Sequence, residues 1–140
     1  MLNLQNKRNA EARDQYIKDH ADLDSEYMGG IKRFSGLHVD DVKHLMEIGA
    51  ADPDDRQNDA PSIQELVDFA SDYADDYDVT FRGYVVSPER DDYRTSIDAI
   101  EVHSDCPIAA QDHDDFMDLA HDHFADDVTS TPTSFDAWWD

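Results

Sequence analysis

The chain has 140 residues and a formal net charge of −23, with 28 Asp and six Glu against eleven Lys and Arg. Such a charge repels nucleic acid and anionic lipid over a Debye length. We therefore expect no direct nucleic-acid binding and no membrane partner, and a basic protein surface is the partner class that the charge favours.

The acidity is concentrated in the C-terminal two thirds. Residues 1–48 hold seven basic and nine acidic groups, whereas residues 49–140 hold four basic and 25 acidic groups, which is −21 of the total −23. The 39% hydrophobic content, with six Tyr and six Phe, suffices for a core. The single Cys106 excludes an internal disulfide, and the sequence shows neither a signal peptide nor an apolar run that could span a membrane. These features predict a soluble cytoplasmic protein.

The N-terminal half predicts two helices. A weakly amphipathic helix is expected over 5–21, with its basic residues Lys7, Arg8, Arg13 and Lys18, and Gly29-Gly30 breaks the pattern. Apolar residues at three- and four-residue spacing predict a second helix over 37–48, ended by Gly49. The Pro- and Asp-rich residues 50–61 are expected to form a loop.

The middle of the chain predicts a helix followed by a hairpin. Ser62 and Glu65 form a capping box, and an apolar stripe continues from it to about residue 77. Residues 79–86 predict a strand, 87–92 a turn and 93–103 the return strand. The apolar phase of that strand slips between Ile97/Ala99 and Ile100/Val102, which indicates a bulge or twist.

A last helix is expected over 112–128, with Asp112 as its N-cap. The order of elements predicts an α+β fold of about four helices packed on a β-hairpin or small antiparallel sheet. Because a lone hairpin is marginal in water, helices should cover one face, or a further strand should form near 31–34. We expect one domain over 1–128, including an N-terminal helix and Gly-Gly break at 1–30. A Ser/Thr/Pro linker and an aromatic tail would follow over 129–140.

Aspartates recur every four residues on two of the predicted helices. Like charges at this spacing destabilise a helix by roughly 0.2–0.5 kcal/mol per pair, so the rows oppose folding. Such inconsistencies gather at functional or environmentally adapted sites. The rows are therefore the candidate partner-binding residues: Asp68, Asp72 and Asp76 on the first helix, and Asp114, Asp118, Asp122 and Asp126 on the second.

The C-terminal aromatic residues are a second candidate contact. Phe135, Trp138 and Trp139 follow the predicted linker, and they either fold back into a groove of the domain or anchor a partner. Trp138 and Trp139 are therefore added to the candidate partner-binding residues.

Metal and catalytic signals are weak. Asp118, His121 and Asp122 share one side of the last helix, but their spacing matches no zinc signature and a second element would have to complete the shell. Cys106 is interpreted as a small buried thiol rather than a nucleophile. The sequence predicts no catalytic residue and no cofactor.

Several functions remain open. The first is a small, non-enzymatic interaction protein, in its concrete form a decoy or regulator of a basic nucleic-acid-binding protein. The alternatives are a metal-dependent enzyme or metal-binding protein using the His/Asp-rich last helix, and a salt-adapted structural domain. Four Lys against seven Arg agrees with salt adaptation, whereas the scarcity of Glu and the near-neutral N-terminal third oppose it. A homodimer is also considered, in which the basic first helix meets the acidic helices of a second copy; a solvated helix face is the other interpretation.

Overall fold

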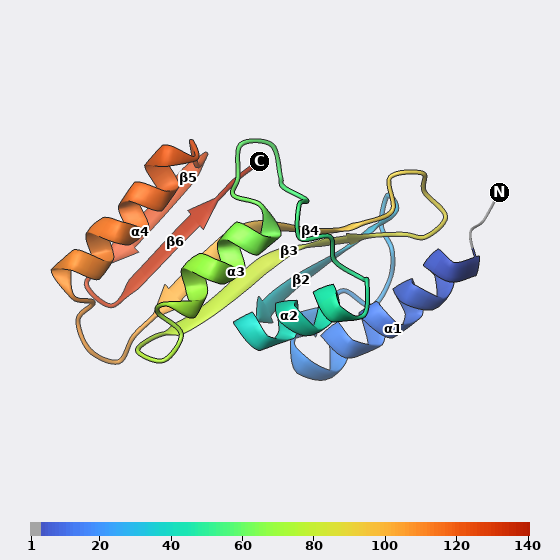
Figure 1. The fold of residues 1–140 in the computed structure, drawn as a ribbon, viewed down its shortest axis with the longest axis horizontal. Helices are drawn as coiled ribbons and strands as arrows, with labels where there is room; N and C mark the ends of the chain where they lie inside the picture. The colour runs from blue at the N-terminus through green and yellow to red at the C-terminus, as the bar shows by residue number, and fades with distance from the viewer. Residues whose placement is uncertain (1–3) are drawn as a thin grey trace.

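Six antiparallel strands form one open sheet, and four helices lie along one face of it in the computed structural model, which describes residues 4–140 (Figure 1). The strand order is β1-β2-β3-β4-β6-β5. The helices are α1 (Leu4–His20), α2 (Val39–Glu47), α3 (Ile63–Ser71) and α4 (Ala110–Asp122). The strands are β1 (Asp22–Leu23), β2 (Ile31–Leu37), β3 (Asp78–Val86), β4 (Thr95–His103), β5 (Asp127–Thr131) and β6 (Ser134–Trp138).

The α+β class is confirmed, but the predicted hairpin is only part of the sheet. β3 and β4 form that hairpin, and the further strand expected near 31–34 is β2, which pairs with β3. The first three residues of the predicted N-terminal segment lie outside the described residues. Within residues 4–140, no helix combines the length and the apolar character needed to cross a bilayer.

The core lies between the four helices and one face of the sheet. Buried side chains from every helix join one cluster with buried side chains of β2, β3, β4 and β6. Each helix contributes through its apolar stripe, for example Ile17 from α1, Val42 from α2, Leu66 from α3 and Phe116 from α4. All four helices therefore cover the same face, and none of the helices within residues 4–140 lies over the opposite face of the sheet.

The predicted irregularity of the return strand is a β-bulge. Arg82 pairs with Ala99 and Gly83 pairs with Ile97, so Asp98 is the extra residue of β4. The bulge reverses the alternation of the strand, which places Ile97 and Ile100 in the core although they are three residues apart. This shift is the physical reason for the phase slip in the sequence.

Two helix boundaries differ from expectation. α3 ends at Ser71 rather than near residue 77, and turns continue the chain to Tyr77. Asp72, Asp75 and Asp76 would lie at the negative end of a longer helix, which disfavours its extension. α4 begins after Ala109, not after Asp112, and ends at Asp122.

The expected linker and aromatic tail over 129–140 instead form part of the sheet. β5 and β6 make a hairpin around Pro132 and Thr133, and β6 pairs with β4. Thr and aromatic residues suit strands, and Phe135 and Ala137 alternate into the core. Phe124 has a φ of +55°, a conformation that separates the end of α4 from β5. The linker prediction treated Ser, Thr and Pro as loop formers and missed this pairing.

Candidate functional site

The capping box predicted at Ser62 starts α3 and fixes its direction. Ser62 Oγ accepts a hydrogen bond from the Glu65 amide at 3.1 Å, and Glu65 Oε1 accepts one from the Ser62 amide at 3.2 Å. The backbone hydrogen bond that Ser62 donates is the main reason that the pKa of Glu65 is lowered. With this start, the apolar stripe of α3 faces the sheet and Asp68 faces outward.

An aromatic seam holds α4 beside α3 and the turns that follow it. Tyr73 donates a hydrogen bond of 2.8 Å to Asp115 Oδ2, and Tyr77 donates one of 2.5 Å to Asp112 Oδ2. The rings of Tyr73 and Phe116 meet edge to face, with centroids 4.8 Å apart. Burial and the bond to Asp115 raise the pKa of Tyr73. Asp112 and Asp115 are therefore part of the seam rather than of the acidic surface.

The remaining aspartates of the two helices form an exposed surface, which we call the acidic face. On α4, Asp114, Asp118 and Asp122 are exposed along one side, and on α3 Asp68 and its C-cap Asp72 are exposed. The seam places α4 beside α3 and the turns that follow it, so these five exposed aspartates belong to neighbouring elements (Figure 1).

Two predicted row members lie beyond the helices and their caps. Asp76 is exposed in the turns after α3. Asp126 follows the end of α4, and its Oδ2 accepts a hydrogen bond of 2.7 Å from the amide of Asp140. The rows are therefore shorter than the sequence spacing predicts, because both helices end early.

No cation neutralises the acidic face. Residues 57–81 and 95–140 contain neither Lys nor Arg. Among residues 4–140, the ion pairs join other carboxylates, and the five side chains of the acidic face take part in none of them.

The two tryptophans do not lie together. Trp139 is 1% exposed, and its indole N–H donates a hydrogen bond of 2.9 Å to the carbonyl of His123. Trp138 is half-buried and lies on the opposite, uncovered face of the sheet, since its strand neighbours Ala137 and Trp139 face the core. Trp139 is thus a core residue, and the acidic face contains neither tryptophan.

The uncovered face of the sheet carries a charge network that the sequence did not reveal. Arg82 contacts the carboxylates of Glu101 and Asp136, with Arg82 Nη1 at 2.5 Å from Asp136 Oδ2. Arg33 Nη2 lies 2.9 Å from Asp98 Oδ2. These residues are far apart in the chain, and only the strand register brings them together, so no local pattern could have indicated the pairs.

Arg13, one of the four basic residues of the first helix, contributes neither to a solvated face nor to a surface for a second copy, because it is fully buried. Its guanidinium donates to Asp14 at 2.9 Å, to Tyr27 at 3.1 Å and to the carbonyl of Val86 at 3.1 Å. These bonds tie α1 to the β3–β4 hairpin. A buried arginine with several partners is indistinguishable in sequence from a solvated one.

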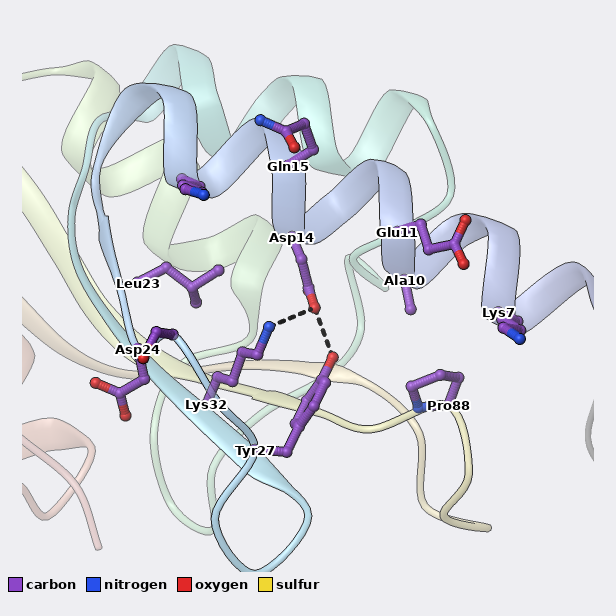
Figure 2. A pocket seen from close by; sticks show the side chains of 12 residues that line it. Lys7, Ala10, Glu11, Asp14, Gln15, Leu23, Asp24, Tyr27, Lys32 and Pro88 are labelled. Atoms are coloured by element: carbon purple, nitrogen blue, oxygen red, sulfur yellow. Dashed lines mark hydrogen bonds and ion pairs between the residues drawn. The ribbon is translucent and has the colours of Figure 1, made fainter.

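Near Arg13, a groove of about 540 Å³ lies between α1 and the chain segment that joins β1 to β2. Figure 2 shows Lys32 and Tyr27 both directed at Asp14, which accepts a bond of 2.6 Å from Tyr27 and lies 3.5 Å from Lys32 Nζ. Three of the four lysines line this groove (Lys7, Lys18 and Lys32), and so do three acids (Glu11, Asp14 and Asp24). The groove is formally neutral within a strongly acidic chain.

The histidines and the cysteine do not form a reactive cluster. Asp118, His121 and Asp122 are all exposed on α4, and in residues 4–140 no three His, Cys, Asp or Glu side chains are arranged to hold a metal ion. His113 is half-buried with its Nε2 3.2 Å from Ser130 Oγ. Cys106 is exposed in the loop after β4, so the expectation of a buried thiol is wrong.

No protein-family model matches the chain, and no curated protein or solved structure is significantly similar to it. What the protein does must therefore be inferred from its own surfaces.

Proposed function

We propose that this protein is an acidic interaction protein that binds a basic protein surface through the acidic face. In its concrete form the protein is a decoy or regulator that occupies the cationic site of a nucleic-acid-binding protein. The carboxylates of Asp68, Asp72, Asp114, Asp118 and Asp122 are the contact groups. The long-range field of the chain, at −23, would speed the encounter with a cationic partner.

The observation that carries the proposal is the absence of compensating charge on two adjacent elements of the described chain. The acidic face holds three like-charged pairs at four-residue spacing: Asp68/Asp72, Asp114/Asp118 and Asp118/Asp122. At roughly 0.2–0.5 kcal/mol each, they oppose folding by about 0.6–1.5 kcal/mol. Other acids of the chain also lack ion pairs; what distinguishes the acidic face is that its five carboxylates lie in segments, 57–81 and 95–140, that contain neither Lys nor Arg.

The spacing of these carboxylates suits a site for a single strand better than one for a duplex. Four helical residues rise about 6 Å along the helix axis, so the α4 row carries one negative charge per roughly 6 Å. Two such rows side by side carry one negative charge per roughly 3 Å. A nucleic-acid strand carries one phosphate per roughly 3.4 Å, and a duplex twice that density. The α4 row extends only about 12 Å, which fits a compact cationic patch.

A displacement assay tests the proposal with two variants of equal net charge. In the row variant, Asn replaces four aspartates of the acidic face: Asp72, Asp114, Asp118 and Asp122. In the control variant, Asn replaces four exposed aspartates elsewhere: Asp22, Asp54, Asp59 and Asp91. Each protein is titrated into a complex of fluorescent single-stranded DNA with a lysine-rich DNA-binding protein.

The wild type and the control variant should release the DNA at similar concentrations, and the row variant should need about tenfold more protein, which corresponds to about 1.4 kcal/mol. Equal loss of activity in both variants would show that the charge acts diffusely, as expected of a salt-adapted surface. That result would overturn the proposal.

A further inference from the structure

β5 is an outer strand of the sheet, and β6 is its strand neighbour. Thr131 pairs with Ser134 across the two-residue turn, so Asp127, Thr129 and Thr131 direct their backbone N–H and C=O groups to β6. By the alternation of an antiparallel ladder, Val128 and Ser130 direct theirs to the free edge. Such a row of backbone groups is a template for another strand.

Apart from Asp127, its first residue, β5 lacks the charges that ordinarily protect an edge strand. Residues 128–135 contain no charged side chain and form the longest uncharged run of the chain. Thr129, Ser130 and Thr131 are exposed. Natural edge strands usually carry Lys or other charges that prevent pairing. In a chain of which 32% is charged, an exposed edge strand with a single charge at one end is therefore notable.

The side of α4 next to this edge presents His113 and Met117 rather than carboxylates. His113 Nε2 lies 3.2 Å from Ser130 Oγ, and Met117, one helical turn after His113, is half-buried. Each residue turns the helix by about 100°. The centre of the row of Asp114, Asp118 and Asp122 therefore lies roughly 120° around the helix axis from the side that carries His113 and Met117. A strand added to β5 would therefore lie beside the histidine and methionine side of α4, away from the acidic row.

We propose that two copies of this chain pair through β5, antiparallel across a twofold axis, to form one continuous sheet. In the register centred on Thr129, each Thr129 faces Thr129 of the second copy, Val128 faces Ser130, and Asp127 faces Thr131. No carboxylate then opposes another carboxylate, and the outward backbone groups of Val128 and Ser130 meet those of the other copy. In this register the edge is self-complementary in its backbone hydrogen-bonding groups, and no two carboxylates meet.

The neutral groove beside α1 offers no such complementarity for a second, acidic copy, because its lysines are balanced by its own acids. Pairing at β5 joins two chains of −23, so repulsion should oppose it at low salt, and screening should relieve the repulsion. Association should therefore strengthen with salt, whereas binding of a basic partner to the acidic face should weaken. The two proposals can fail independently.

Sedimentation equilibrium over a protein concentration series, at about 0.5 M salt, tests the pairing. The apparent molecular mass of the wild type should rise from 16.0 kDa to twice that value as the protein concentration increases. Thr129→Asp and Thr129→Lys should each remain monomeric, because the new charge meets its own copy across the axis. An equimolar mixture of the two variants should dimerise again, since opposite charges then face each other.

The matched controls are Ser25→Asp and Ser25→Lys, at an exposed residue that lines the α1 groove. Both should dimerise like the wild type, and circular dichroism should show that all variants are folded. A monomeric wild type at every concentration would overturn the proposal. So would a dimer that responds to Ser25 rather than Thr129, or a mixture of the Thr129 variants that stays monomeric.

A disulfide provides a positional test. Residues facing each other in a non-hydrogen-bonded antiparallel pair have Cα atoms about 4.5 Å apart, within the range that disulfides span. Thr129→Cys in a Cys106→Ser background should therefore cross-link under mild oxidation, and Ser25→Cys in the same background should not. Absence of a cross-link at position 129 would contradict the register.

Discussion

The hydroxyl of Tyr73 donates a hydrogen bond of 2.8 Å to the carboxylate of Asp115, and this contact sets the position of α4 relative to α3. It also divides the aspartates of α4 into two groups. Asp112 and Asp115 face the tyrosines of the seam, and Asp114, Asp118 and Asp122 face solvent. The acidic face therefore depends on the seam for its geometry.

Replacing Tyr73 with Phe should lower the unfolding free energy by about 1–2 kcal/mol, because a partly buried hydrogen bond to a carboxylate is lost while the ring still packs on Phe116. Urea denaturation measures the change. Tyr93→Phe is the matched control: the Tyr93 hydroxyl is buried without a hydrogen-bond partner, so its removal should be neutral or stabilising. Equal losses in the two variants would contradict the role of the seam.

Replacing Arg13 with Met should destabilise the protein by about 3–5 kcal/mol, because it removes a fully buried cation and the hydrogen bond that it donates to the buried Val86 carbonyl. Arg8→Met, at an exposed position of the same helix, should change stability little. The measurement is again urea denaturation. An Arg13 variant as stable as the Arg8 variant would show that the contacts of Arg13 with the hairpin do not hold α1 in place.

Local signals predicted most of the helices and the central hairpin. The capping box at Ser62 and the phase slip around Asp98 are visible in the sequence because each depends on residues within a few positions. The pairing of β6 with β4 joins residues more than 30 positions apart, and nothing near Ser134 indicates it. The Thr- and Ser-rich residues 129–134 therefore predict a linker, and the predicted sheet lacks β5 and β6.

Replacing Gly83 with Ala should destabilise the protein by about 3 kcal/mol or more, at the upper end of the range for overpacked cores. A Cβ at this position would lie 2.0 Å from the carbonyl oxygen of Ser96 and 2.8 Å from the Phe34 ring. Gly49→Ala is a useful comparison, since no atom lies near its Cβ and only its φ of +75° is strained. Thermal unfolding should rank Gly83→Ala as clearly the worse of the two; the reverse order would contradict the packing at the bulge.

The acidic positions of the candidate site could be predicted from four-residue spacing, but their environment could not. The same spacing assigns Asp76 and Asp126 to the rows, and only the early ends of α3 and α4 remove them. Asp115 looks equivalent to Asp114 in sequence, and its bond to Tyr73 depends on how two helices pack. The half-buried position of Trp138 and the burial of Trp139 likewise follow from strand register rather than composition.

Stability should fall steeply in alkaline solution. Burial and the hydrogen bond to Asp14 raise the pKa of Tyr27 from 10.0 to about 12, and burial and the bond to Asp41 raise that of Tyr16 to about 12. The unfolded chain releases these protons first, so the stabilisation is complete below about pH 10 and is lost as pH rises from 10 to 12. In melting curves over this range, Tyr27→Phe should show a shallower decline than the wild type. An unchanged decline would show that Tyr27 is not protonated preferentially in the folded state.

The affinity for a lysine octapeptide, measured by calorimetry at low salt for the row variant and the control variant, tests the role of the acidic face most directly. Both variants lose four negative charges, so long-range attraction changes equally, and only the position of the charges differs. We expect the row variant to bind about tenfold more weakly than the wild type, about 1.4 kcal/mol, and the control variant to bind nearly as well. The row variant should also unfold at a higher temperature, because like-charge pairs on α4 are removed. Equal affinities for the two variants would contradict the assignment of the acidic face as the binding surface.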